Sequence, residues 1–307
     1  MIISASRRTD IPSFYFDWFL NRIRDGYVFA RNPMNPRQVG RVPLKPNVVD
    51  GIVLWTKNPS PMLNRIDEIS PFPFYVQYTL NSYQTDVEPN LPSKDDVLIP
   101  VLQKLSDIIG AGRVVWRYDP ILLSEKYTID HHIDFFETTA RRLRGYTEKC
   151  TISFVDYYRK TANRVRDLGL IDATAEDKDI LAKSFSEIAR GYGLAVDTCA
   201  EDINLDKYGI SHARCIDDRI FEKVYGIKLD VGKDRSQRRE CGCVSSIDIG
   251  LYNTCGHGCK YCYANYSPEI VLRNAQAHDA CSPLLCGGIC ENDVVTDRKM
   301  HSQIYRG

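Results

Sequence analysis

The chain has 307 residues, of which 43% are hydrophobic, 10% aromatic and 26% charged. This composition is typical of a globular protein with enough apolar material for a core, and it excludes a mainly disordered chain. The 40 basic residues balance 40 acidic ones, so the overall charge does not indicate binding to nucleic acid or to a membrane surface. A local basic patch would still allow nucleic acid as a partner.

Strand and helix patterns alternate through the first half of the chain. An amphipathic helix is predicted for residues 16–23, with Gly26 just beyond it. Residues 26–44 interrupt the alternation and indicate an excursion or a hairpin. Pro100 would break a helix begun earlier, so we predict that the next helix starts near this residue. The predicted strands of this half are 2–6, 51–56, 74–80 and 113–118.

The same alternation continues in the second half. Thr174 and Asp177 form a capping-box pattern before an apolar stripe, and Gly191 is expected to cap the end of that helix. A further helix is predicted after Ser267, and another covers residues 129–143. The predicted strands of this half are 150–155, 194–198 and 246–251.

Strands separated by helices, with few hairpin signals, predict an α/β fold with parallel strands and right-handed crossovers. We expect a partial or closed (β/α) TIM-like barrel. Residues 1–226 would form its core, and residues 227–307 would be a cysteine-rich C-terminal segment that completes the barrel. In such barrels, functional side chains gather where strands end.

The ends of the predicted strands carry polar residues that are candidates for chemistry. Lys57 follows the second strand and could contact a cofactor or substrate, or extend to solvent. Arg117 and Asp119 could act in catalysis or pair with each other as a structural ion pair. Because loops at strand ends are often polar for solubility alone, these three residues are candidates as a group.

The N-terminus and the cysteine content indicate a compartment. The opening MIISASRRTDIP has too short an apolar run for a signal peptide, and no window reaches the roughly 18 apolar residues of a membrane span. We therefore expect a cytoplasmic protein without a membrane partner. The 11 cysteines are an odd number, and most follow residue 240, which favours metal-binding thiolates over disulfides.

The most specific motif is TCGHGCKYCYAN, in which Cys255, Cys259 and Cys262 have the spacing CxxxCxxC. Three thiolates on one loop can ligate three irons of a [4Fe-4S] cluster and leave the fourth iron open. An open coordination position is typical of catalytic metal centres. The alternative is a zinc site, which normally requires four protein ligands, and His257 inside the loop is badly placed to be the fourth.

This loop resembles that of the radical S-adenosylmethionine superfamily, in which an aromatic residue, here Tyr261, precedes the last cysteine. The resemblance implies that S-adenosylmethionine (SAM) binds the open iron and is cleaved reductively to a 5'-deoxyadenosyl radical, with a low-potential electron donor such as flavodoxin or ferredoxin. The family's loop usually lies near the N-terminus. Its C-terminal position here is consistent with a circularly permuted barrel, in which strand 2–6 would lie beside strand 246–251.

The superfamily often has a Gly-Gly-Glu-like segment that holds the amine of SAM, and this sequence has none. By position, the segment SRRTD takes its place. Asp10 is suited to an ammonium group, and the arginines are suited to a carboxylate. The cofactor-binding candidates are therefore Ser6, Arg7, Arg8, Thr9, Asp10 and Tyr261.

Over nearly its whole length the chain also resembles a bacterial family known as DUF1848, described as having a C-terminal cysteine cluster like that of radical SAM proteins. The matching stretches are SASRRTDIP, LWTKNP, VVWRYDPILL, ISFVDYYRK and DIGLYNTCGHGCKYCYAN. The family name supplies no substrate. It supports the expected fold and cofactor, and the substrate remains unknown.

Four other cysteines could form a second site. Cys199 ends a predicted strand, Cys215 follows it, and Cys241 and Cys243 form a CxC pair ahead of the cluster strand. They could bind an auxiliary [4Fe-4S] cluster or a zinc ion, or be unconnected thiols. The remaining group near the C-terminus, Cys281, Cys286 and Cys290, is interpreted as unconnected thiols.

Two other functions fit parts of the sequence. A non-catalytic module could use zinc or an iron–sulfur cluster to stabilise the C-terminal region of a barrel scaffold. A metal-independent barrel hydrolase could instead use Asp10, Asp119 and Asp156. The cysteine spacing favours the radical SAM enzyme over both.

Overall fold

The computed structural model describes residues 1–156 and 161–306. Part of the ISFVDYYRK stretch, residues 157–160, lies outside the described residues. The strands are β1 (Ile2–Ala5), β2 (Tyr27–Arg31), β3 (Gln38–Pro43), β4 (Gly51–Thr56), β5 (Phe74–Thr79), β6 (Val114–Ile121), β7 (Leu123–Ser124), β8 (Lys149–Phe154), β9 (Leu170–Ile171), β10 (Ala195–Thr198), β11 (Ser211–His212), β12 (Ser246–Asp248) and β13 (Val294–Asp297).

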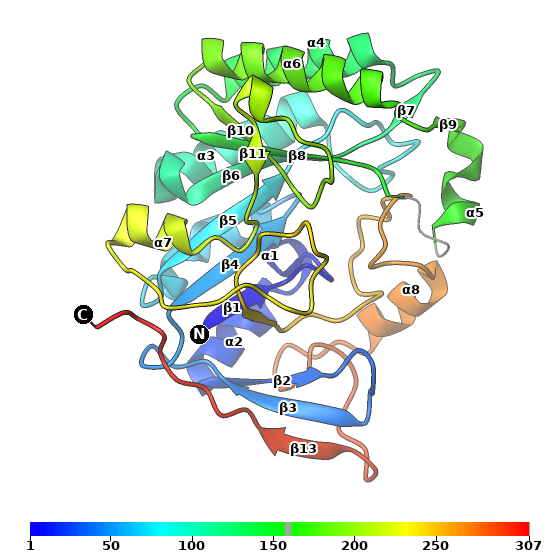
Figure 1. Ribbon diagram of the computed structural model, residues 1–307. Helices are drawn as coiled ribbons and strands as arrows, with labels where there is room; N and C mark the ends of the chain where they lie inside the picture. Colours follow the sequence, from blue (N-terminus) through cyan, green and yellow to red (C-terminus); the bar gives the residue numbers. More distant parts are fainter. Residues whose placement is uncertain (157–160, 307) are drawn as a thin grey trace.

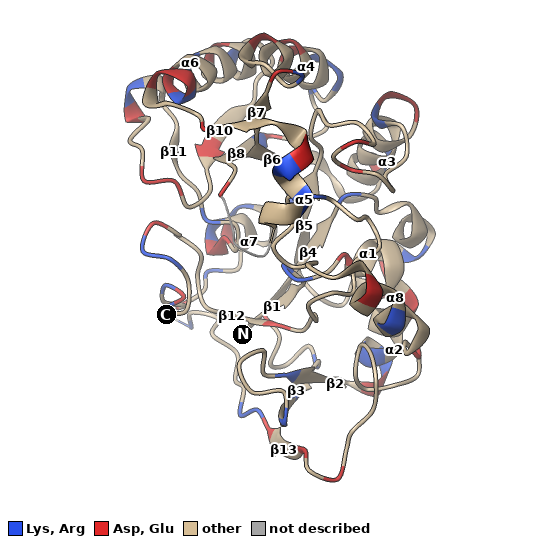
Figure 2. Cartoon of the chain, turned by 90° about the vertical axis from the view of Figure 1, so that its right-hand side faces the viewer, with Lys and Arg blue, Asp and Glu red and all other residues tan. Residues whose placement is uncertain are grey.

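Helices connect most of these strands. They are α1 (Ile11–Phe14), α2 (Phe16–Asp25), α3 (Ile99–Ile109), α4 (Ile129–Arg142), α5 (Ala162–Val165), α6 (Ala175–Gly191), α7 (Asp218–Tyr225) and α8 (Pro268–Gln276). Among the described residues, none of the helices is long and apolar enough to cross a membrane. Acidic and basic residues alternate over the helices and loops (Figure 2), which agrees with the zero formal net charge.

The main sheet has eight strands in the order β11-β10-β8-β6-β5-β4-β1-β12. Every neighbouring pair is parallel, so the predicted α/β fold with parallel strands is confirmed. All seven predicted strands are present in this sheet. The eighth, β11, has only two residues, which is too short for a sequence pattern to indicate.

The sheet is not closed into a barrel. β11 and β12 are its two edges, and no pairing joins them in the part of the chain that the structure describes. Of the partial or closed barrel expected from the sequence, the closed form is therefore wrong, and the C-terminal segment contributes β12 as one edge of the open sheet. Edge strands of two and three residues offer too few backbone groups to close the ring by hydrogen bonds.

The N-terminal strand β1 pairs with β4 on one side and with β12 on the other, with Ile2 opposite Ser246 and Ser4 opposite Asp248; β12 is labelled beside β1 in Figure 2. The expected neighbourhood of the first strand and the cysteine-loop strand is thus confirmed. Residues 6–10, which follow β1, and the cysteine loop, which follows β12, consequently leave the sheet side by side. Because of this placement, residues 6–10 and the cysteine loop can line the same cavity.

Helices α4 and α6 pack together over the upper strands in Figure 1. Their contact includes stacked rings of Phe136 and Phe185 with centroids 4.1 Å apart. His132 of α4 is fully buried, and its Nδ1 contacts the hydroxyl of Tyr118 at 2.5 Å. His132 therefore lies on the buried face of the helix.

The region after the first helix is the expected hairpin. β2 and β3 pair antiparallel, and β13 from the C-terminal end adds to β3 in parallel. This small sheet lies below β1 in Figure 1, apart from the large sheet. β13 was not predicted, because its few residues carry no distinctive pattern and are exposed.

The start of α3 at Ile99, next to Pro100, confirms the predicted helix start, whereas the end of α6 differs from the prediction. A short π-helical segment, Lys94–Leu98, precedes α3. In this segment Leu98 N–H donates to the Ser93 carbonyl at 3.0 Å. The wider turn allows Pro100 to follow inside the first turn of α3. The capping box at Thr174 is confirmed, but Gly191 belongs to α6, and Tyr192 is the residue after its end.

Candidate metal and cofactor site

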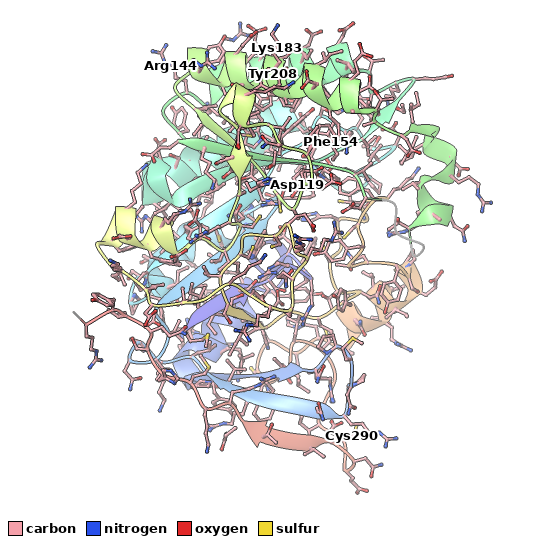
Figure 3. All side chains as sticks on the ribbon, viewed as in Figure 1. Asp119, Arg144, Phe154, Lys183, Tyr208 and Cys290 are labelled. Atoms are coloured by element: carbon pink, nitrogen blue, oxygen red, sulfur yellow. The ribbon has the colours of Figure 1, made fainter. Side chains whose placement is uncertain are left out.

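A cavity of about 790 Å³ opens where the strands of the large sheet end. This volume is within the usual range for small-molecule sites. Asp119 and Phe154, which line it, lie near the ends of β6 and β8 in Figure 3. Every candidate site residue from the sequence lines this cavity: Ser6, Arg7, Arg8, Thr9, Asp10, Lys57, Arg117, Asp119, Cys199, Cys215, Cys241, Cys243, Cys255, Cys259, Tyr261 and Cys262.

The CxxxCxxC loop is a closed turn at one side of the cavity. Asn253 N–H donates to the Ala264 carbonyl at 2.8 Å and joins the two ends of the loop. The Asn265 amide donates to the Cys255 carbonyl at 2.9 Å, and Cys262 N–H donates to the Cys259 carbonyl at 3.1 Å. All three cysteines are free thiols, so the backbone presents three available sulfur ligands to one cavity.

Contacts from other segments fix this loop from outside. The Asn90 side chain donates to the Gly256 carbonyl at 2.8 Å, and Lys260 N–H donates to the Val87 carbonyl at 3.0 Å. The guanidinium of Arg164 donates to the Cys262 carbonyl at 2.6 Å and to the Cys259 carbonyl at 3.4 Å. Arg164 also places a positive charge beside the thiols, where it favours thiolate ligands.

His257, inside the loop, is not turned toward the three cysteines as a ligand. Its Nε2 lies 2.8 Å from an oxygen of Asp10, and both side chains are buried. Asp10 also accepts hydrogen bonds from Ser13 N–H at 2.9 Å and Lys57 N–H at 2.7 Å. Asp10 therefore ties together the cysteine loop, α1 and the end of β4, a structural role that the sequence did not indicate.

The SRRTD segment faces the cavity with unused polar groups. Buried Arg7 Nε and Thr9 Oγ1 have no hydrogen-bond partner among residues 1–156 and 161–306. Buried polar groups without partners are costly in proteins unless a ligand or water satisfies them. A polar ligand such as an amino-acid carboxylate fits these two groups, whereas the oxygens of Asp10 are already occupied.

Asp248 on β12 holds SRRTD in position. Its carboxylate accepts from Ser6 Oγ at 2.6 Å, from Arg7 N–H at 2.8 Å and from Gly250 N–H at 3.0 Å. Sequence reasoning missed this residue, although a carboxylate inside a β-rich run was a signal. The contact links the segment after β1 directly to the strand that leads into the cysteine loop.

Substitution of Gly250 by alanine should destabilise the protein. An added Cβ would lie 2.0 Å from Ser6 Oγ, so the junction of β1 and β12 would have to shift, at a cost of about 1–3 kcal/mol. Urea denaturation of Gly250→Ala against wild type measures this cost. Gly191→Ala is the control, because its Cβ would meet no atom within 4 Å; equal stability of both variants would contradict the expectation.

A buried charged network lies beside the cysteine loop. Glu88 is 1% exposed, and its carboxylate pairs with Lys57 at 2.7 Å and with Lys94. The Tyr261 hydroxyl donates to the same carboxylate, and the Lys57 ammonium lies 5.5 Å from the Tyr261 ring centroid. Burial alone would raise the pKa of Glu88, but the two lysines lower it to about 2. Lys57 is thus held by an ion pair and does not extend freely to solvent.

Glu88 could not be identified from the sequence, because it lies in a loop with no motif. The structure makes it the partner of two candidate residues, Lys57 and Tyr261. Lys57 is also an electrostatic neighbour of Cys259. The network therefore sets the orientation of one cation and one aromatic ring at the edge of the cysteine site.

Arg117 and Asp119 form an ion pair. A structural ion pair was one of the two roles expected for them, and catalysis was the other. Arg117 also donates to Cys215 Sγ at 2.9 Å, and its guanidinium lies 5.2 Å from the Trp55 ring centroid. The other oxygen of Asp119 accepts from Ser153. Contacts with Cys215, Trp55 and Ser153 therefore fix the orientation of this ion pair. Asp119 is part of the cavity wall.

Glu201 is a further cavity carboxyl that the sequence analysis did not single out. One oxygen accepts from Phe154 N–H at 2.7 Å, and Lys178 lies 3.9 Å from the other. Burial, with a smaller contribution from Asp156 and Asp119, raises the pKa of Glu201 to about 7. Glu201 closely follows Cys199 at the end of a predicted strand, and this position is the signal by which the sequence could have identified it.

The raised pKa of Glu201 predicts a pH dependence of stability. The protonated form is favoured in the fold, so the stabilisation is complete below the ordinary value of 4.5 and is lost as the pH rises through about 7. Between about pH 5 and 8 the free energy of unfolding should fall by about 2–3 kcal/mol from this group. Glu201→Gln should remove that component in urea denaturation, whereas Glu187→Gln on the exposed side of α6 should keep it.

The second cysteine set is brought together by the fold. Cys199 Sγ and Cys215 Sγ are 3.0 Å apart. The thiol of Cys243 is a close neighbour of those of Cys215 and Cys241. Within residues 1–156 and 161–306, no three or more His, Cys, Asp or Glu side chains are arranged to hold one metal ion. A cluster differs from a single ion because it offers each thiolate its own iron.

The C-terminal cysteines and Asp156 differ in their location. Cys281, Cys286 and Cys290 are not among the cavity-lining residues, and Cys290 lies beside β13, far from Asp119 (Figure 3). Asp156 lines the cavity together with Asp10 and Asp119, but Asp10 is occupied by its internal contacts.

A family model described as "Domain of unknown function (DUF1848)" matches residues 2–264. The match covers the large sheet, the SRRTD segment and the complete cysteine loop, and it ends before α8 and β13. The search of curated proteins gave no match.

Proposed function

The chain belongs to the DUF1848 family, and we propose that it is a radical SAM enzyme with a [4Fe-4S] cluster on Cys255, Cys259 and Cys262. One observation carries the proposal: the three thiols and the SRRTD segment line the same cavity although they come from opposite ends of the sequence. The open eight-stranded sheet would then be a circularly permuted, partial radical SAM barrel. Its substrate is unidentified.

The residues that line the cavity fit both the [4Fe-4S] cluster and SAM. Three free thiols on one loop match a cluster with one open iron. Arg7 Nε and Thr9 Oγ1 are unpaired among the described residues and are suited to the carboxylate of SAM. When bound, the cluster would supply the electron that cleaves SAM to a 5'-deoxyadenosyl radical.

The chain's own residues would position and shield this chemistry. Tyr261 and Lys57 are oriented by Glu88, and Arg164 and Lys57 add positive charge near the thiolates. Arg117 and Asp119 lie on the cavity wall and are candidates for substrate contact. A cytoplasmic location and an electron donor such as flavodoxin or ferredoxin belong to the same proposal.

Anaerobic reconstitution with iron and sulfide, followed by dithionite and SAM, tests the proposal. We expect 5'-deoxyadenosine, measured by chromatography and mass spectrometry, to form only with the reconstituted protein. Absence of both a cluster and 5'-deoxyadenosine in fully reconstituted protein would overturn it.

The same experiment separates the proposal from a non-catalytic metal module. Zinc without iron, or an iron–sulfur cluster that neither binds nor cleaves SAM, would favour that module. A shift of the cluster's electron paramagnetic resonance spectrum on SAM addition would support binding at the open iron independently of turnover.

A further inference from the structure

We propose that Cys199, Cys215, Cys241 and Cys243 bind a second [4Fe-4S] cluster, which connects the two edges of the open sheet. The four residues come from three separate segments: the end of β10, the loop after β11 and the segment before β12. The fold nevertheless brings all four to one wall of the cavity. This site is distinct from the CxxxCxxC loop.

The thiols follow one another in the order Cys199, Cys215, Cys243 and Cys241. The first two sulfur atoms are 3.0 Å apart, and Cys243 is a close neighbour of both Cys215 and Cys241. Four cysteines are the usual complete ligand set of a [4Fe-4S] cluster. A cluster accepts ligands spread over its four corners, which suits thiols that contact one another in a row better than a single zinc ion does.

The backbone around these thiols is well fixed. The Cys215 carbonyl accepts from the Gln77 amide at 2.7 Å and from the Tyr75 hydroxyl at 2.8 Å. Ile216 N–H points to Cys243 Sγ at 3.3 Å, and Val244 N–H donates to the Ile216 carbonyl at 3.1 Å. The loop after β11 and the segment before β12 are thus already joined, with the sulfur atoms between them.

Positive charge surrounds the sulfur atoms. Arg117 donates to Cys215 Sγ at 2.9 Å, and Arg7 is an electrostatic neighbour of Cys243 and Cys215. Hydrogen bonds from cationic groups to ligand sulfur atoms stabilise thiolate-bound clusters and tune their potential. Cys150 offers the contrast: it is a fully buried cysteine inside β8 that does not line the cavity.

The second cysteine site lies where the two edges of the open sheet are not joined by strand pairing. In the described part of the chain β11 and β12 do not pair; Cys215 follows β11, Cys241 and Cys243 precede β12, and Cys199 follows the neighbouring strand β10. A metal cluster held by both sides would join the sheet edges by coordination bonds where hydrogen bonds are absent among the described strands. Metal binding across such a junction contributes directly to folding stability.

Iron analysis of a chain without the first site tests this inference independently of the proposed enzyme activity. In Cys255→Ala/Cys259→Ala/Cys262→Ala, anaerobic reconstitution should still give about four irons and four sulfides per chain, against about eight of each in wild type. Adding Cys215→Ala and Cys243→Ala should reduce the content to background.

Two controls guard against misfolding. Cys215→Ala/Cys243→Ala in the otherwise intact chain should keep about four irons at the first site, which shows that the chain folds. Cys281→Ala, an exposed cysteine outside the cavity, should leave the wild-type iron content unchanged.

Three outcomes would overturn the second cluster: background iron in the triple variant, iron there that is insensitive to Cys215 and Cys243, or zinc at these four cysteines. A wild-type protein with only the first cluster that still cleaves SAM would remove this inference and leave the proposed function intact.

Discussion

Replacement of Cys259 by alanine should abolish 5'-deoxyadenosine formation. Cys259 is the most buried of the three loop cysteines and supplies the central ligand of the set. Without it, the loop keeps two thiolates, which cannot retain a cluster that leaves one iron for SAM. The product should fall to the level of protein without iron, as measured by mass spectrometry.

The iron content of Cys259→Ala should fall by about four per chain, and not to zero if the second cluster is present. Cys281→Ala is the matched control, because that thiol is exposed and lies outside the cavity. Normal SAM cleavage by Cys259→Ala would rule out the assigned ligand set.

Replacement of Glu88 by alanine should cause the largest loss of stability. The change leaves Lys57 and Lys94 without their shared partner, and their side chains are only 14% and 12% exposed. Removal of one member of a buried ion pair typically costs about 3–5 kcal/mol, because a charge is left uncompensated. Urea denaturation near neutral pH measures the change in the free energy of unfolding.

Glu68→Ala is a suitable comparison, since Glu68 also pairs with two cations, Arg65 and Arg24, but lies on the surface. We expect a cost of about 1 kcal/mol or less there. The pKa of Glu88 is lowered to about 2, so its contribution is present above about pH 4.5 and is lost as the pH falls toward 2. An equal cost for Glu68→Ala and Glu88→Ala would contradict the buried network.

Much of the fold was predictable because its strands are apolar runs at regular spacing. The resemblance of the cysteine loop to radical SAM proteins, combined with its C-terminal position, also predicted that β1 and β12 would be neighbours, which the register of Ser4 opposite Asp248 confirms. Sheet closure was not predictable, because it depends on edge strands as short as β11. A strand of two residues is too short for its alternation of apolar and polar side chains to be recognised in the sequence.

The shared location of the candidate residues on one cavity was predictable, but their contacts with one another were not. Motifs and strand ends indicated the residues that line the cavity. They did not indicate that Asp10 is occupied by His257, nor that Glu88 reaches Lys57 from a loop without a motif. Such contacts join residues distant in sequence, and spacing along the chain contains no information about them.

The pairing of β1 with β12 also sets the order in which the protein can be built. Ser6 and Asp248 are 242 residues apart, so at about 5–20 residues per second the ribosome needs roughly 10–50 s to supply the partner of β1. During this time one edge of a wholly buried strand has no β12 to pair with, and such edges promote aggregation. We therefore expect the nascent chain to depend on chaperones until β12 emerges, and the proposed cluster could be inserted into the cysteine loop only after the rest of the sheet has been synthesised.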